Sequence, residues 1–234
     1  MGGKEFIMKA LVLLSGGLDS STCLAMAVDK FGSENVIALS LSYGQKHIRE
    51  VQAAKAIAEY YHVKHIEYDV KGIFDGSECT LLTGNDDVPE ESYAEQLQHT
   101  DGKPVSTYVP FRNGLFLSVA TSMAMSNGCN VIYYGAHKDD AAGNAYPDCS
   151  VYFHKAMSEA IKEGTSNAVD LCDPFIDRTK ADIVKMGLEL KVPYEKTWSC
   201  YNGGDKPCGK CGTCIDRMKA FEDNGRIDPL MIGE

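Results

Sequence analysis

The sequence predicts an α/β protein with a parallel, Rossmann-like sheet and a small metal-binding segment near the C-terminus. Between residues 9 and 70, apolar runs alternate with amphipathic stretches of helical length, which is typical of a parallel sheet with helices on both faces. The first apolar run ends in a turn rich in glycine and serine, as phosphate-binding turns often are. Four cysteines near the C-terminus have the spacing of metal ligands.

Size, composition and charge narrow the class of protein. The 234 residues are 44% hydrophobic, which suits one domain of ordinary size, with or without an appendage. No apolar run is long enough to span a membrane, and the N-terminal residues lack the features of a secretory signal. We therefore expect a cytoplasmic protein. The formal net charge of −10 argues against direct binding of nucleic acid.

The first elements are three strands joined by two helices. The second strand is almost continuously apolar, as expected for a parallel strand buried on both faces. Ligands of such sheets bind beyond the C-terminal ends of the strands, so the turns after the first two strands should share one site. The strands are predicted at Lys9–Leu14, Val36–Ser42 and Lys64–Val70, and the helices at Asp19–Phe31 and Lys46–Tyr61.

The segment 71–107 interrupts this alternation. It is acidic and contains neither Lys nor Arg between Asp75 and Asp101. One interpretation is a solvated loop with a short helix around Glu90–Gln98. The other is a mobile lid over the nucleotide, because long irregular connections in compact domains often serve as lids. The sequence favours neither interpretation.

Alternation resumes after this segment. Asn113 is a candidate N-cap for the next helix, and Thr179 with Asp182 predicts the N-terminus of the last helix before the cysteines. The predicted elements are a helix at Gly114–Ser126, a strand at Val131–Gly135, a helix at Tyr152–Glu163, a short extended piece at Ile176–Arg178 and a helix at Thr179–Leu190.

The turn after the first strand reads Ser15-Gly16-Gly17-Leu18-Asp19-Ser20-Ser21. Backbone N–H groups at the start of a helix stabilise an anionic phosphate, and glycine lets a phosphate approach the main chain closely. The motif is neither GxxxxGK[ST] nor GxGxxG. The alternatives are a strand–helix turn without a ligand and, for Asp19, a role as a helix cap only.

The clustered cysteines are Cys200, Cys208, Cys211 and Cys214. Four thiolates close together suit a tetrahedral Zn²⁺ site of the structural kind. An iron–sulfur cluster is the alternative, but a further cysteine three residues on would then be expected, where the chain has Arg217. We expect a structural staple rather than a nucleic-acid ribbon, because few lysines surround it. The five other cysteines are expected to be small buried residues.

The loop Ser-Gly-Gly-x-Asp-Ser resembles the PP-loop of the ATP pyrophosphatase superfamily, whose domains are adenine nucleotide alpha hydrolase-like. Further blocks extend the resemblance to the QueC family of 7-cyano-7-deazaguanine synthases. This family more often has Gly where this chain has Phe111. The blocks are Tyr43-Gly44-Gln45-Lys46-His47, Val109-Pro110-Phe111-Arg112-Asn113, Tyr146-Pro147-Asp148-Cys149 and the tail Thr197-Trp198-Ser199-Cys200-Tyr201 with its later cysteines.

The resemblance implies an ATP-dependent C–N ligase of queuosine biosynthesis. It would convert 7-carboxy-7-deazaguanine and ammonia to the nitrile through an adenylated acid and an adenylated amide, with ATP, Mg²⁺ and Zn²⁺. A homodimer is expected from the family. The implied domains are an ATP-binding catalytic domain at 8–190 and a zinc-binding segment at 191–234 packed on it.

The resemblance also implies roles for individual residues. For Lys180 and Arg112 the alternative is an ion-paired or solvated side chain; for Tyr146 and Asp148 it is a turn with a helix cap; for His47 it is a surface position. The implied groups are Asp19, Lys180 and Arg112 in catalysis, Leu14, Ser15, Gly16, Gly17, Leu18, Asp19, Ser20 and Ser21 at ATP and Mg²⁺, Tyr43, Gln45, His47, Arg112, Asn113, Tyr146 and Asp148 at the second substrate, and the four clustered cysteines at zinc.

Two competing functions stay open at this level. One is another PP-loop adenylating enzyme, such as a tRNA thiolase or an ammonia-dependent amide synthetase. A thiolase should show a basic face and a reactive cysteine near the nucleotide, whereas this chain is acidic and its clustered cysteines have metal spacing. The other is a nucleotide-sensing or zinc-ribbon binding module, which would bind ATP without turnover.

Overall fold

A computed structural model describes residues 8–46 and 49–232 of the chain. The described strands form one sheet in the order β3-β2-β1-β4-β5, and all neighbouring strands pair in parallel. Sequence order therefore reverses between β1 and β4, which is where ligands bind in open α/β sheets. The strands are β1 (Ala10–Leu13), β2 (Val36–Ser42), β3 (Lys64–Asp69), β4 (Val131–Tyr133) and β5 (Asp170–Cys172).

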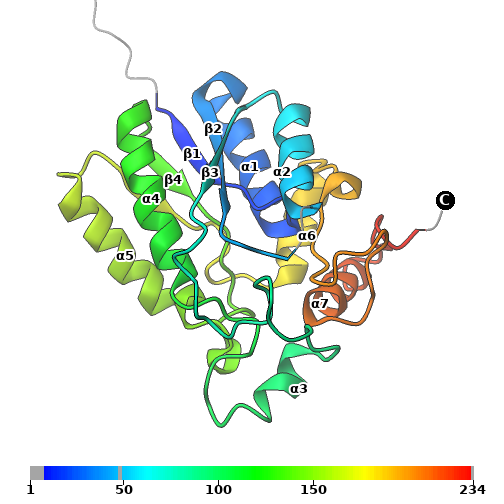
Figure 1. Cartoon of the computed structure of the whole chain (residues 1–234). Helices are drawn as coiled ribbons and strands as arrows, with labels where there is room; N and C mark the ends of the chain where they lie inside the picture. Colours follow the sequence, from blue (N-terminus) through cyan, green and yellow to red (C-terminus); the bar gives the residue numbers. More distant parts are fainter. Residues whose placement is uncertain (1–7, 47–48, 233–234) are drawn as a thin grey trace, which may run out of the picture.

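Helices cover both faces of this sheet, α4 and α5 on one face and α1, α2 and α6 on the other (Figure 1). Side chains of a strand alternate between faces, so Leu11 packs into the core under α4 while Val12 packs under α1. The helices are α1 (Leu18–Phe31), α2 (Arg49–Tyr60), α3 (Tyr93–Leu97), α4 (Arg112–Asn127), α5 (Val151–Gly164), α6 (Lys180–Glu189) and α7 (Gly212–Glu222).

Most predicted elements are confirmed, but three details are wrong. Helix α4 begins at Arg112 rather than after Asn113, and its N-cap position is Phe111, which caps no N–H group. The backbone N–H of Asn113 is instead bound by the Asp148 carboxylate at 2.9 Å. The predicted extended piece at Ile176–Arg178 is largely a turn, and the edge strand is the unpredicted β5. The predicted start of helix α2, Lys46, is not helical; the described part of the helix begins at Arg49, and residues 47–48 lie outside the described part.

The segment 71–107 is only in part the solvated loop of the first interpretation, because many of its residues are exposed while others pack into the core. Cys79, Leu81, Leu82 and Val105 are buried in the main core, and the Asn85 side chain donates to two backbone carbonyls of the same segment. The short helix predicted around Glu90–Gln98 is confirmed as α3, with a capping box. Tyr93 of α3 lines the cavity described below, and the interpretation of the segment as a mobile lid stays a prediction.

The residues after α6 return to the PP-loop. The backbone N–H of Trp198 donates to the Gly16 carbonyl at 2.8 Å, and Phe221 of α7 is buried in the same core as α1. The Arg217 guanidinium makes two hydrogen bonds to the carboxylate of Asp228. The C-terminal segment is thus packed on the α/β unit, while the boundary between 190 and 191 stays a prediction. No described helix is both long and apolar enough to cross a membrane.

Candidate active site

A cavity opens at the C-terminal ends of β1, β2 and β4, at the point where strand order reverses. Its walls come from the PP-loop, the start of α2, the start of α4, the β4 loop and the C-terminal segment. The polar residues that line it are Ser15, Asp19, Ser20, Ser40, Tyr43, Gln45, Glu50, Tyr93, Arg112, Asn113, Tyr134, Asp140, Lys180, Ser199, Tyr201 and Thr213.

The PP-loop is held in shape by its own hydroxyl groups. Ser20 Oγ accepts the backbone N–H of Ser15 at 3.2 Å and lies 3.0 Å from Ser15 Oγ. Helix α1 starts after Gly17, and no side chain caps its first turn. Unpaired N–H groups at a helix start, facing a cavity, are suited to bind an anion.

Gly16 explains why the loop needs glycine. Its φ is +85°, and a Cβ there would lie 2.4 Å from the Glu50 carbonyl oxygen and 2.5 Å from the Ala54 nitrogen. Both are backbone atoms of α2, so the contact has little room to relax. Gly16 therefore fixes the loop against α2 rather than facing the cavity, and it is not among the lining residues.

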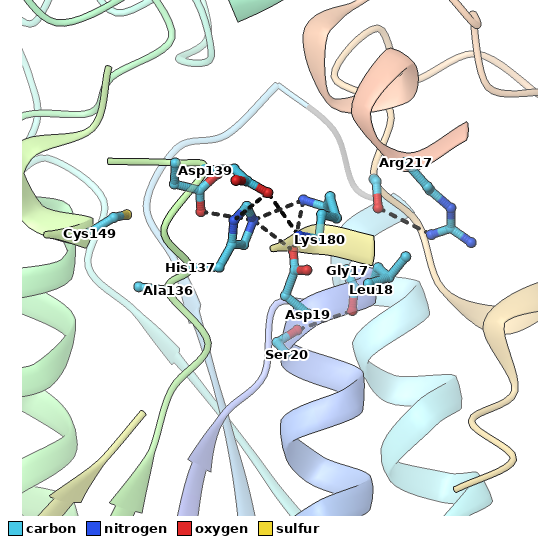
Figure 2. A network of polar contacts seen from close by, with 12 residues as sticks. Gly17, Leu18, Asp19, Ser20, Ala136, His137, Asp139, Cys149, Lys180 and Arg217 are labelled. Atoms are coloured by element: carbon cyan, nitrogen blue, oxygen red, sulfur yellow. Dashed lines mark hydrogen bonds and ion pairs between the residues drawn. The ribbon is translucent and has the colours of Figure 1, made fainter. Parts of the chain in front are cut away.

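A buried polar network lies beside the loop. Lys180 Nζ is 3.1 Å from Asp19 Oδ2 and 3.2 Å from His137 Nε2, and His137 Nε2 is 3.2 Å from Asp140 Oδ2. Figure 2 shows Asp19, His137 and Lys180 pointing toward one another from α1, the β4 loop and α6. The capping box of Thr179 and Asp182 sets the start of α6 and so positions Lys180.

The network keeps Asp19 ionised and Lys180 protonated. Burial alone would raise the pKa of Asp19, but the Lys180 ammonium and His137 more than offset it and lower that pKa. Burial likewise opposes the charge of Lys180, yet Asp19, Asp140 and Asp216 raise its pKa. Asp19 is the second residue of α1, not its cap. Its Oδ1 atom is buried without a hydrogen-bond partner among the described residues.

The opposite wall carries donors and aromatic rings. Arg112 Nη1 donates to the Tyr43 hydroxyl at 3.0 Å, and the guanidinium lies over the Tyr43 ring. The Gln45 side chain accepts the Tyr43 N–H at 2.8 Å. Asn113 is held by Asp148 and Cys149. A planar acid could be held here between rings and guanidinium.

The structure brings together most of the predicted site residues but not all of them. Leu14, Ser15, Gly17, Asp19 and Ser20 line the cavity, as do Tyr43, Gln45, Arg112, Asn113 and Lys180. Leu18 and Ser21 are buried behind the loop. His47 lies outside the described residues.

Tyr146 and Asp148 do not line the cavity. Both are buried, and the Asp148 carboxylate is occupied by the N–H of Asn113. The Tyr146 hydroxyl bonds to Thr107, and its ring packs edge-on against Tyr93, which does line the cavity. Asp148 and Tyr146 therefore lie behind the wall and contact Asn113 and Tyr93, which line the cavity.

Several lining residues were missed from the sequence. Glu50 lies in helix α2, far along the chain from the PP-loop, so no local sequence pattern indicates that it reaches the same cavity. Tyr93 and Tyr201 come from distant segments and meet through their hydroxyls at 3.3 Å. His137 was also missed. It does not line the cavity but is buried beside Asp19 and Lys180, and its place in the loop after β4 was the one available signal.

The four cysteine sulfurs lie within 4.8 Å of one another. Tetrahedral Zn²⁺ with thiolate ligands needs sulfurs about 3.8 Å apart, and Cys208 Sγ and Cys214 Sγ are 4.0 Å apart. Backbone N–H groups of Cys208 and Cys211 point at cluster sulfurs, as in the outer shell of metal sites. The donor set thus suggests a closed zinc site. Two of its ligands, Cys200 and Cys214, are sequence neighbours of Tyr201 and Thr213, which line the cavity.

The parallel sheet, the loop at its switch point and the facing lysine define a nucleotide-binding protein of the PP-loop class. The family model described as "Queuosine biosynthesis protein QueC" matches residues 9–225, and the chain belongs to this family. The chain is 44% identical over 228 residues to a 7-cyano-7-deazaguanine synthase of Archaeoglobus fulgidus, covering 97% of this chain and 91% of the relative.

Two further relatives carry the same name. The protein of Thermoplasma acidophilum is 45% identical over 231 residues, and the match covers 95% of this chain and 91% of that protein. The protein of Marinomonas sp. is 39% identical over 222 residues, and the match covers 95% of this chain and 97% of that protein. The similarity therefore extends over both the α/β unit and the cysteine segment.

Proposed function

We propose that this protein is an ATP-dependent ligase that converts 7-carboxy-7-deazaguanine and ammonia to 7-cyano-7-deazaguanine. The observation that carries the proposal is one cavity with two unlike walls. The PP-loop and Lys180 form a wall for phosphate, and Arg112, Asn113 and the tyrosines form a wall for a planar acid. The membership in the QueC family supports the same reaction.

The first chemical step is activation of a poor electrophile. A carboxylate oxygen of the substrate attacks the α-phosphorus of ATP, the bond to the β-phosphate oxygen breaks, and pyrophosphate leaves. The N–H groups of α1 and the Lys180 ammonium stabilise negative charge that moves to the outer phosphates. Arg112 orients the acid, with its guanidinium already held by Tyr43.

Magnesium has a suitable position in this scheme. Asp19 Oδ1 is buried without a partner among the described residues, and carboxylate oxygens together with phosphate oxygens are the ligands that Mg²⁺ prefers. Asp19 would hold the ion, which neutralises polyphosphate charge when bound. Lys180 would keep Asp19 ionised and in place.

The remaining steps reuse the same groups. Ammonia attacks the activated carboxyl carbon, the bond to AMP breaks, and a primary amide results. A second ATP then adenylates the amide oxygen, and loss of AMP with two protons leaves the nitrile. The proposal also includes a homodimer, which the family resemblance implies, and a cytoplasmic location, which suits a biosynthetic enzyme.

The test is release of pyrophosphate that depends on the carboxylated base. We expect purified, zinc-loaded protein to release pyrophosphate from ATP and Mg²⁺ only when the acid is present. Replacing Lys180 with Met should reduce that release by about 100-fold or more, because a charge aimed at the transition state is lost. Release of orthophosphate, or ATP binding without any acid-dependent turnover, would contradict the proposal and favour a nucleotide-sensing module.

A further inference from the structure

Three acidic side chains line the cavity, and they are not equally neutralised. Asp19 is paired with Lys180 at 3.1 Å, and Asp140 lies 3.2 Å from His137. Glu50 also lines the cavity, but no hydrogen bond or ion pair joins its carboxylate to any residue in the ranges 8–46 and 49–232. A carboxylate without a protein partner in a cavity is available to a ligand that brings its own donors or positive charge.

The fold places Glu50 beside the phosphate loop. It lies in the first turn of α2, and its carbonyl oxygen is so close to Gly16 that a Cβ there would be 2.4 Å away. The backbone of Glu50 is therefore fixed against the loop that would hold the outer phosphates of ATP. Its side chain faces a cavity that also contains Arg112 and Tyr201. Glu50 is thus positioned between the two proposed substrate walls.

The charges of the reactants favour one ligand for this carboxylate. In the proposed reaction, ATP and the carboxylated base are both anions, and a free carboxylate would repel them. Ammonium is the one cationic reactant other than metal ions. We propose, on the basis of the proposed function, that Glu50 binds ammonium beside the activated carboxyl group and accepts a proton from it as the C–N bond forms.

The step balances within these groups. Ammonium gives one proton to the Glu50 carboxylate and becomes ammonia, whose lone pair attacks the carboxyl carbon. The C–O bond to AMP then breaks, and AMP leaves with the bonding pair. The N-protonated amide that results loses a second proton to solvent and becomes the neutral amide. Glu50 returns its own proton to solvent before the next turnover.

The surroundings of Glu50 suit this role. Loss of solvation raises the pKa of Glu50 to about 7, with Arg112 acting against the rise and Cys200 adding to it, so the group can both hold and release a proton near neutral pH. Arg112 is already bonded to Tyr43. Burial raises the pKa of Tyr43 to about 12 and that of Tyr201 as well. These phenols therefore stay neutral, and their oxygen atoms and ring faces can accept a cation.

The Glu50→Gln variant tests the inference, with Glu59→Gln on the exposed side of the same helix as the matched control. We expect E50Q to release one equivalent of pyrophosphate per active site, from ATP and the acid without ammonium, at a rate within a few-fold of wild type. Amide formation from ammonium should fall by about 100-fold or more, the range for loss of a proton acceptor. Hydroxylamine is uncharged at neutral pH, so E50Q should form the hydroxamate from it at nearly the wild-type rate. E59Q should match wild type in all three assays.

Each other outcome would overturn the inference. If E50Q loses pyrophosphate release, Glu50 acts in activation of the acid. If it uses ammonium normally, or is equally impaired with hydroxylamine, Glu50 is not the site of ammonium. If E50Q mainly loses the ability to discriminate 7-carboxy-7-deazaguanine from an analogue without the 2-amino group, Glu50 binds the N–H groups of the base instead. Failure of the proposed function is distinguishable, because wild-type protein would then release no acid-dependent pyrophosphate.

Discussion

Two carboxylates in one cavity have opposite pKa shifts, and the neighbours of each explain the sign. Burial raises the pKa of both, but for Asp19 the Lys180 ammonium more than compensates. Glu50 lacks such a partner among the described residues, so its pKa rises to about 7. Asp19 therefore stays ionised near neutral pH and can bind a metal cation, whereas Glu50 can gain and lose a proton there. Displaced pKa values of this kind concentrate at functional sites.

The raised pKa of Glu50 predicts a pH-dependent cost to folding. Its pKa in the folded state lies above the unfolded value of 4.5, so ionised Glu50 destabilises the fold as pH rises from about 4.5 to about 7. We expect Glu50→Gln to raise the free energy of unfolding by about 1–3 kcal/mol at pH 8 and to change it little at pH 4.5. Urea unfolding of both proteins, without substrates, measures this. A variant less stable than wild type at pH 8 would show that the carboxylate has a structural partner.

The PP-loop, α2 and the C-terminal segment meet at Gly16. Its carbonyl accepts Trp198 N–H, and its missing side chain admits α2. This is a three-way contact between elements distant in sequence. We therefore expect that displacing the phosphate loop, the proposed ammonium site or the segment before the zinc cluster would also displace the other two.

Gly16→Ala should therefore damage more than local backbone conformation. The methyl group would overlap backbone atoms of α2 at 2.4 and 2.5 Å, and we expect a loss of about 2–4 kcal/mol in unfolding free energy and of ATP binding. Gly76→Ala is the matched control, because Gly76 has the same φ of +85° but nothing within 4 Å of its Cβ position. It should cost only about 1 kcal/mol from backbone strain. Equal losses for both variants, measured by urea unfolding and calorimetric ATP titration, would mean that strain and not the α2 contact explains the glycine.

The elements that the sequence predicts well are those with strong local periodicity or caps. Strand β2, helix α1 and the Thr179 cap are decided by residues within one turn or one strand. The start of α4 was mispredicted because the acceptor for its N–H group is Asp148, in a different element. Strand β5 has three residues, one of them the exposed Asp170, so its sheet pairing is decided by β4 and not by its own pattern.

The same division applies to the candidate site. The PP-loop and the cysteines could be predicted because each motif is contiguous or nearly so. Glu50, Tyr93 and Tyr201 reach the cavity only through tertiary packing, so no local pattern marks them. Asp148 lies in a motif typical of the family, yet the motif does not tell whether its carboxylate faces a ligand or another backbone N–H. That distinction depends on where α4 begins.

At the scale of the whole molecule, the cysteine segment forms part of the cavity wall. Trp198, Ser199, Tyr201 and Thr213 line the cavity. The buried Arg217 joins Asp228 to the residues just before the cluster. A metal at the four cysteines would therefore stabilise one wall of the proposed active site as well as the end of the chain.

Cys211→Ala tests this coupling. We expect loss of about one equivalent of zinc and a markedly lower unfolding temperature, because binding of a structural metal contributes directly to folding. Cys129→Ala, at a buried cysteine outside the cluster, should keep its zinc and lose about 1–2 kcal/mol at most. Elemental analysis and thermal unfolding measure both effects. Unchanged zinc content in Cys211→Ala would remove Cys211 from the ligand set.

The most direct test of the central claim follows nitrogen into the product. Zinc-loaded protein is incubated with ATP, Mg²⁺, ¹⁵N-ammonium and 7-carboxy-7-deazaguanine, and the base is analysed by mass spectrometry over time. The proposed function predicts a labelled amide that rises and then declines as a labelled nitrile accumulates, with AMP and pyrophosphate formed alongside. Folded, zinc-replete protein that yields neither labelled amide nor labelled nitrile would contradict it.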